Sequence, residues 1–284
     1  MASSSRDRES GRVSVAACLK HVDKRPEIDS LTGEVRVDER TSGASEADLA
    51  ALEWALRLAS ARSTDVVVIT AGSAAADPML RDALAAGAVR AIRVELADDT
   101  PSDGVATALA ASLPADVDLV VCGDWSVDRG SGSVPAYLAA RRGAAQALGL
   151  VTLHDGGSVI TAERRLDGGR RERLRVRAPA VLSVEGASAR LRRAPLDGIV
   201  RARGAEIHVV HDHFEHRSPD AVRRGPYRPR ARSLPAPSGI EARDRILALT
   251  GALVDREPPQ RLVLSPADAA DRLLEQLRRW GYLS

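Results

Sequence analysis

The sequence predicts an α/β fold built on a doubly wound, mostly parallel sheet, with an added β-hairpin and an extended C-terminal arm that ends in a helix. Three observations predict it. Short apolar runs alternate with segments of helical periodicity up to about residue 150, which is typical of parallel α/β sheets. An Asp-Gly pair then separates two strand-like runs, which predicts the hairpin. Residues 217–262 are rich in Pro, Arg and Ser, which predicts the arm.

Composition bounds the possible functions. The chain has 284 residues, of which 44% are hydrophobic, enough for a sizeable core in one large domain or two small ones. Its 41 basic and 39 acidic residues leave a net charge of +2, and 2% of residues are aromatic, which argues against nucleic-acid binding. No apolar stretch approaches the roughly 18 residues of a membrane span. Cys18 and Cys122 lie in apolar runs, as expected of buried, reduced thiols in a cytoplasmic protein.

The first part of the chain predicts a leader, a strand, a small hairpin and a long helix. Residues 1–12 are charged, lack the apolar core of a signal peptide and predict a disordered leader. Val13–Leu19 is an apolar run suited to a strand buried on both faces, and residues 34–38 suggest the hairpin. Ser45 then predicts the N-cap of a helix to about Ala61, because the acidic Asp48 favours a helix start three residues later.

The alternation of strands and helices continues beyond this helix. We expect strands at 66–71, 89–94 and 117–122, and helices at 78–86, 104–113 and from 134 to about 142. Right-handed crossovers between parallel strands place the carboxyl ends of all these strands at one edge of the sheet. Open α/β sheets bind their ligands at that edge.

Beyond about residue 150 the pattern changes. Residues 158–164 and 170–177 flank the Asp-Gly turn, and the apolar run after Pro179 predicts a further strand. Residues 242–254 predict a short helix, and residues 267–280 predict an amphipathic one. We therefore divide the chain into an α/β domain at 13–210 and an arm at 211–284. The arm is either a flexible tail or a segment that packs on a partner chain, which would cover the apolar stripe of the last helix.

The strongest candidate for ligand binding is the Gly- and Ser-rich turn at 123–133. It follows a buried strand and precedes a helix, so its backbone N–H groups and the helix dipole suit a phosphate. Ser131 and Ser133 offer hydroxyls and Arg129 a positive charge, whereas Asp128 would repel a phosphate and suits a ribose or a backbone amide. The turn matches neither a Walker A loop nor G-x-G-x-x-G. The alternative is a flexible loop without a ligand.

A second cluster holds four histidines and two acids at 208–216, namely His208, His211, Asp212, His213, Glu215 and His216. These residue types ligate metals, but no single strand or helix presents all four histidines together. A solvated His-rich loop is therefore the default, and a metal site is the alternative. We find no nucleophile with a partner base and no G-x-S-x-G elbow. The arginines at 170–177 are typical of the solvated face of a hairpin.

Several segments resemble the beta subunit of the electron transfer flavoproteins. The most specific is 162–183, where Asp167-Gly168-Gly169 follows a basic residue and precedes an acidic residue, an aliphatic residue and a Pro-x-aliphatic-aliphatic-small ending, like the hairpin signature of that family. The other matching segments are 20–22, 53–58, 80–88, 195–202 and 258–261. The resemblance runs in order from about residue 13 to the end of the chain.

The resemblance implies a Rossmann-like fold similar to that of adenine-nucleotide hydrolases, and an electron carrier rather than an enzyme. It implies a heterodimer in which an alpha subunit holds most of the FAD and the arm of this chain wraps that partner. The complex would carry electrons from flavin or related dehydrogenases to a quinone-linked acceptor. This subunit would hold AMP or, as in electron-bifurcating members, a second FAD. By position, the implied nucleotide shell comprises Cys18, Ser45, Glu46, Ala47, Asp48, Ala71, Gly123, Asp124, Trp125, Ser126, Val127, Asp128, Arg129, Gly130, Ser131, Gly132, Ser133 and Val134.

The chain also departs from the family pattern. Ser45-Glu46-Ala47 replaces Asn-Pro-Phe, and only Asp128 is kept from the family's Asp-Asp-Asp-x-x-Gln-Thr-Gly loop. AMP, a second FAD and an empty site therefore stay open. The family's dehydrogenase-recognition loop corresponds to a basic segment here, which predicts an acidic docking surface on the partner. That segment comprises Ser188, Ala189, Arg190, Leu191, Arg192 and Arg193.

These departures resemble the beta-like subunits encoded with mycofactocin systems. Two other functions stay open beside electron transfer. One is a stand-alone adenine-nucleotide-binding module, and the other is a metal-binding protein that uses the cluster at 208–216.

Overall fold

A computed structural model of the chain describes residues 13–211, 236–237, 239–250 and 261–283. The chain divides into two units, Met1–Tyr227 and Arg228–Ser284, which are described separately. The expected leader at 1–12, most of the expected arm between 212 and 260, and the matching residues 258–260 lie outside the described residues. The division of the chain at residue 210 stays a prediction.

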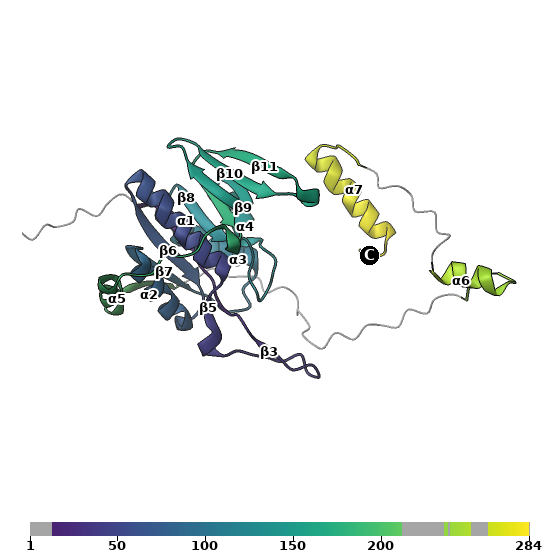
Figure 1. The fold of residues 1–284 in the computed structure, drawn as a ribbon, viewed down its shortest axis with the longest axis horizontal. Helices are drawn as coiled ribbons and strands as arrows, with labels where there is room; N and C mark the ends of the chain where they lie inside the picture. The colour runs from purple at the N-terminus through teal and green to yellow at the C-terminus, as the bar shows by residue number, and fades with distance from the viewer. Residues whose placement is uncertain (1–12, 212–235, 238, 251–260, 284) are drawn as a thin grey trace, which may run out of the picture. The chain divides into compact units, whose positions relative to one another are not determined.

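Within the described residues, nine strands form one large sheet in the order β11-β10-β9-β12-β8-β1-β6-β7-β13 (Figure 1). Neighbouring strands from β9 to β13 in that order are parallel, and β9, β10 and β11 are antiparallel to one another. This confirms the doubly wound, mostly parallel sheet with an added hairpin. The strands are β1 (Val13–Cys18), β6 (Asp65–Ala71), β7 (Arg90–Glu95), β8 (Leu119–Gly123), β9 (Ala145–Asp155), β10 (Ile160–Arg165), β11 (Arg171–Val176), β12 (Ala180–Val184) and β13 (Ile207–His211).

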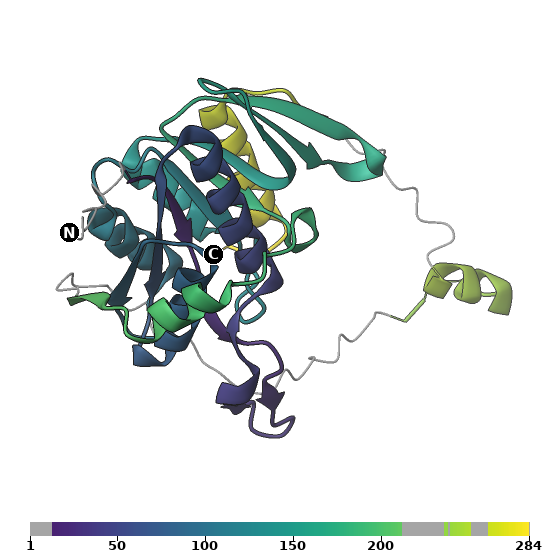
Figure 2. The same cartoon turned by 60° about the vertical axis from the view of Figure 1, so that its left-hand side comes forward.

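Helices cover both faces of this sheet (Figure 2). Helices α1 (Glu46–Arg62) and α2 (Asp77–Ala86) pack on one face, and α3 (Ser102–Ser112) and α4 (Val134–Arg142) pack on the other. Strand β1 sends Val15 and Ala17 into the first core and Ala16 and Cys18 into the second. This two-sided burial explains why its sequence is a continuous apolar run rather than an alternating one.

Two strands of the large sheet, β9 and β13, and helix α5 (Leu196–Arg203) were not expected from the sequence. Strand β9 buries Ala147, Leu150 and Leu153, a spacing of three residues. Its pairing with β12 shifts register near Gly149, which has a left-handed φ of 68°. The irregularity removes the alternation that marks a half-buried strand, so the sequence pattern did not reveal it.

For the first two histidines of the cluster at 208–216, the expectation of a loop is wrong, whereas both side chains are exposed to solvent as expected. His208 and His211 lie in β13, which pairs in parallel with β7 at one edge of the sheet. Nδ1 of His211 lies 2.7 Å from Oε2 of Glu95 on β7. His213 and His216 lie outside the described residues. The described residues contain no group of three or more His, Cys, Asp or Glu side chains that could hold a metal ion.

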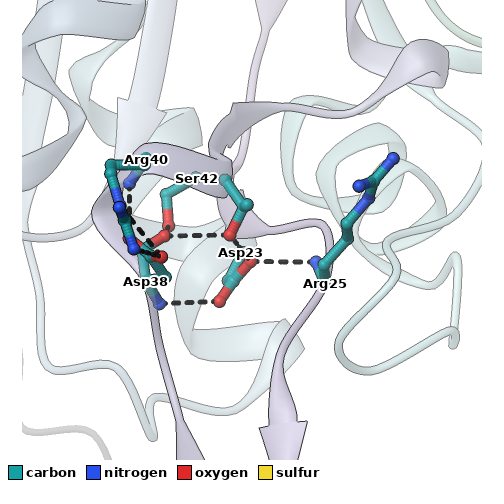
Figure 3. A network of polar contacts seen from close by, with 6 residues as sticks. Asp23, Arg25, Asp38, Arg40 and Ser42 are labelled. Atoms are coloured by element: carbon teal, nitrogen blue, oxygen red, sulfur yellow. Dashed lines mark hydrogen bonds and ion pairs between the residues drawn. The ribbon is translucent and has the colours of Figure 1, made fainter.

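A small polar network fixes the excursion between β1 and α1 (Figure 3). Strand β2 (His21–Asp23) pairs with β5 (Ser42–Ala44), and β3 (Glu27–Ile28) pairs with β4 (Val35–Arg36) at the expected small hairpin. The carboxylate of Asp23 accepts hydrogen bonds from the Thr41 hydroxyl and from the backbone N–H groups of Arg25 and Asp38. These bonds hold the pKa of Asp23 below its ordinary value.

The hairpin of β10 and β11 confirms the Asp-Gly prediction, since Asp167–Gly169 forms the turn. In the second unit, α6 (Ala242–Thr250) and α7 (Pro266–Arg279) fall where the sequence predicted helices. Ser265 caps α7 by accepting a hydrogen bond from the N–H of Asp268. None of the helices in the described part of the chain combines the length and the apolar character that a membrane span needs.

Candidate functional site

The candidate site lies where β1 stands between β8 and β6. From β1 the chain winds outward to β6 and β7 on one side and returns to β8 and β12 on the other. This reversal of strand order is the place where open α/β sheets bind ligands, beyond the carboxyl ends of their strands. Cys18 ends β1, Ala71 ends β6 and Gly123 ends β8. The structure therefore brings the predicted residues of these three strands to one edge of the sheet.

The N-terminus of α1 reaches the same edge through a capping box. The Ser45 hydroxyl accepts a hydrogen bond from the N–H of Asp48, and the Asp48 carboxylate accepts one from the N–H of Ser45. Both side chains are buried. This arrangement satisfies backbone donors that a helix start would otherwise leave unpaired, and it confirms Ser45 as the N-cap.

Two glycines let α1 approach the strand ends closely. A Cβ on Gly123 would lie 2.9 Å from Oδ1 of Asp48 and 3.0 Å from Cβ of Ala47. A Cβ on Gly186, which follows β12, would lie 3.1 Å from the backbone N of Ala47. Larger residues at these positions would push the helix away from the edge. Gly186 was not among the predicted residues, although its place just after a buried strand is the signal that could have found it.

Asp48 is the most perturbed acid of this edge. Burial raises the pKa of its carboxyl to about 6, against hydrogen bonds from Ser45 and from the backbone N–H of Lys20, which favour the charged form. Nearby, Cys18 and Cys122 are paired in register on β1 and β8, and both are buried free thiols. A hydrogen bond with Cys18, together with burial, raises the pKa of the Cys122 thiol. A thiol with a raised pKa is a poor nucleophile.

The loop between β8 and α4 is held from three sides. The N–H of Asp124 donates to the carbonyl of Val184 on β12. The ammonium of Lys20 contacts both carboxylate oxygens of Asp128, at 2.7 and 2.5 Å. The guanidinium of Arg129 donates to the carbonyls of Asp98 and Thr100, in the connection between β7 and α3. These hydrogen bonds and the ion pair tie the loop to β12, to Lys20 and to the connection between β7 and α3.

Other residues of the predicted loop differ in their exposure and in their hydrogen bonds. Ser131 and Ser133 hydrogen-bond to each other at 3.0 Å. Trp125 and Val127 expose 51% and 39% of their surface, so neither is part of the core. Asp124 keeps one buried carboxylate oxygen, Oδ1, without a hydrogen-bond partner among the described residues, and burial raises the pKa of this carboxyl. Such an oxygen is a ready acceptor for a ligand hydroxyl.

The segment 188–193, predicted as a partner-docking loop, is anchored on α1. The buried carboxylate of Glu53 accepts hydrogen bonds from the backbone and side chain of Arg192 and from the side chain of Arg57. The indole N–H of Trp54 donates to the Ser188 hydroxyl. Burial acts to raise the pKa of Glu53, but the arginines outweigh it and lower the pKa. One of the three arginines of this loop is therefore already paired within the chain.

The fold and this edge define the class: a doubly wound α/β protein with glycine-lined strand ends at its switch point. The model for the family described as "Electron transfer flavoprotein domain" matches residues 35–216, more than half of the chain. The chain belongs to the electron transfer flavoprotein family.

Individual relatives agree with this membership. The chain is 31% identical over 171 residues to "Protein FixA" of Rhizobium meliloti, and 32% identical over 169 residues to "Electron transfer flavoprotein subunit beta" of Mycobacterium leprae. Each alignment covers 56% of this chain, and they cover 58% and 63% of the two relatives. The chain thus spans less than two thirds of the length of these relatives.

Proposed function

We propose that this chain is the beta subunit of a heterodimeric electron transfer flavoprotein, a carrier of electrons rather than an enzyme. The observation that carries the proposal is the family match over residues 35–216, together with the similarity to a protein named as a beta subunit. The partner is an alpha subunit that holds most of the FAD. The donors are flavin or related dehydrogenases, and the acceptor is quinone-linked. Two buried thiols suit a reducing compartment, for which we propose the cytoplasm.

We propose that the edge beyond β1 and β8 holds an adenine nucleotide, either AMP or a second FAD. The residues present fit such a ligand. Gly123 and Gly186 bring the N-terminus of α1 close to the strand ends, and a ribose hydroxyl would supply the donor that Oδ1 of Asp124 lacks among the described residues. FAD, when bound, supplies the electron-transfer chemistry. The residues of this chain position the nucleotide and stabilise the folded domain around it.

We propose that residues 188–193 contact the dehydrogenase. Arg190 and Arg193 are exposed, and the loop backbone is tied to α1 through Glu53. A rigid loop with exposed positive charge favours a partner with an acidic surface. We also propose that the chain belongs to the branch of beta-like subunits encoded with mycofactocin systems, which the basic character of this loop supports.

Co-expression with the alpha subunit tests the proposal. We expect a complex that co-purifies with bound flavin, seen in its absorption spectrum, and that releases AMP or additional FAD when denatured. A chain that purifies alone, binds no second subunit and turns over a substrate would contradict the proposal. That result would instead favour a stand-alone adenine-nucleotide-binding module, for which the same strand edge would serve.

A further inference from the structure

The charge of the candidate site is not arranged as the sequence suggested. Arg129 was expected to supply the positive charge, but its guanidinium is committed to the carbonyl oxygens of Asp98 and Thr100. Acids surround the edge instead, since Asp48, Asp124 and Asp128 lie there and Glu185 follows β12. Arg165 forms an ion pair with Glu185. A phosphate therefore needs a different cation.

Lys20 is placed to be that cation. It follows the carboxyl end of β1, and its backbone N–H donates to Asp48 at the start of α1. Its ammonium reaches the loop after β8, where it contacts Asp128 and lies 3.4 Å from the Ser126 hydroxyl. Lys20 thus joins the two loops that flank the switch point. Lys20 and Asp128 each leave 39% of their side chains exposed, so the pair is open to solvent.

The carboxylate of Asp128 is bound to the Lys20 ammonium as an anion would be. Both carboxylate oxygens lie within hydrogen-bond distance of the ammonium. Burial acts to raise the pKa of Asp128, but the hydrogen bonds from Lys20 and Ser126 outweigh it and lower the pKa. A phosphate oxygen forms the same charge-assisted bond with an ammonium, and a half-exposed ion pair costs little to exchange.

We propose that Lys20 receives the phosphate of the adenine nucleotide and that Asp128 holds this position until the nucleotide binds. The inference rests on the proposed function, because it names the recognition residue of the proposed nucleotide site. Binding exchanges one anion for another on the same ammonium and frees Asp128 from its contact across the two loops. AMP and the pyrophosphate of FAD share this chemistry, whereas adenosine lacks it.

Affinity measurements on the full-length chain, alone and with the alpha subunit, test the exchange with AMP, FAD and adenosine as ligands. We expect Lys20→Gln to weaken AMP binding by about tenfold or more and to leave adenosine binding unchanged. Asp128→Asn removes the competing carboxylate, so AMP binding strengthens by a few-fold and adenosine binding stays the same. The second lysine, Lys24, provides the matched control, and Lys24→Gln leaves all affinities unchanged. The measurement with FAD shows whether the Lys20 substitution weakens the binding of AMP, of the dinucleotide FAD, or of both.

The two lysines allow a second, direct measurement. Reductive methylation with isotopically labelled formaldehyde keeps the charge of both side chains and gives each a resolved NMR signal. We expect AMP to shift the Lys20 signal and to leave the Lys24 signal in place, and adenosine to shift neither. This readout is independent of any loss of folding caused by a substitution.

The outcomes separate this inference from the proposed function. If Lys20→Gln binds AMP as tightly as the wild type does, the proposed exchange is wrong while the electron-transfer proposal stands. The same holds if a complex that carries flavin binds neither AMP nor adenosine. If AMP binding depends on Lys20 but no flavin-bearing complex forms, the exchange stands and the electron-transfer proposal fails.

Discussion

Asp48 and Glu53 lie five positions apart on α1, and both carboxylates are buried, yet their surroundings affect them in opposite directions. At the candidate site, burial raises the pKa of Asp48 to about 6, since its partners are a hydroxyl and backbone N–H groups and the Lys20 ammonium is turned toward Asp128. At the loop anchor, the guanidinium groups of Arg57 and Arg192 overcome burial and lower the pKa of Glu53. Burial alone does not fix the charge state of an acid; the partners beside it decide.

The two buried acids of α1 also have different structural roles. Its start holds a carboxylate that ionises at a cost beside the strand ends, which is typical of ligand-binding sites. One turn later, a fully paired carboxylate ties a distant loop to the helix. The first arrangement leaves a titratable carboxyl at the strand ends, and the second ties residues 188–193 to the helix.

The largest expected effect is a change in the pH dependence of stability when Asp48 is replaced by Asn. Because the folded-state pKa of about 6 lies above the ordinary value of 3.8, the protonated acid stabilises the fold at low pH, and this contribution is lost as the pH rises through 6. Between pH 4 and pH 7, we expect the wild type to lose about 2 kcal/mol of unfolding free energy relative to Asp48→Asn. Urea denaturation of both proteins across this range measures the difference. Parallel pH profiles would show that Asp48 is solvated in the folded chain.

The second effect is the loss of stability when Glu53 is replaced by Gln, and the stability that Glu53 contributes depends on pH in the opposite direction to that of Asp48. Glu53→Gln leaves Arg57 and Arg192 without their shared carboxylate, and because both arginines are half exposed, we expect a loss of about 2 kcal/mol at pH 7. The lowered pKa of Glu53 means that this contribution is present above the ordinary pKa and is lost as the pH falls toward the folded-state value.

Hydrogen exchange supplies a local readout for the same substitution. The N–H of Arg192 donates to Glu53, so its exchange should accelerate in Glu53→Gln, while amides in β1 keep their protection. Unchanged exchange at Arg192 would mean that the loop is held by other contacts.

A third substitution tests how much the N-cap of α1 contributes to stability. Ser45→Ala removes the hydroxyl that caps the helix, and we expect a loss of about 1 kcal/mol in thermal or urea unfolding. Ser265 caps α7 in the same way, but the described side chains of α7 are not buried. Ser265→Ala is therefore the matched control and should leave the unfolding of the α/β unit unchanged.

The smallest effect concerns an exposed ion pair. Asp197 and Arg201 form an i,i+4 contact on α5 with both side chains largely exposed. We expect Asp197→Asn to leave the urea midpoint unchanged within error, because exposed pairs are screened by solvent. A clear loss of stability would show that α5 is packed more tightly in solution than its exposure indicates.

Local patterns in the sequence were sufficient for much of the fold. The apolar run of β1, the Ser45 cap and the Asp-Gly turn each depend on a few adjacent residues, so periodicity and turn chemistry revealed them. Residues 124–133 were likewise expected between a buried strand and a helix, and they connect β8 to α4; that they bind a ligand stays a prediction. The expected assignment of charge to Arg129 was less successful, since nothing adjacent in the sequence indicates that its guanidinium turns toward Asp98 and Thr100.

The sequence by itself therefore determined the class of fold and which strand ends meet at one edge of the sheet. The tertiary structure alone decided that β9 lies between β12 and β10, that Lys20 meets Asp128 across 108 positions, and that Glu53 meets Arg192 across 139 positions. The physical reason is the range of the interactions. Helix caps, turns and buried runs are stabilised by near neighbours, whereas strand order and long-range ion pairs form only when the whole sheet is assembled.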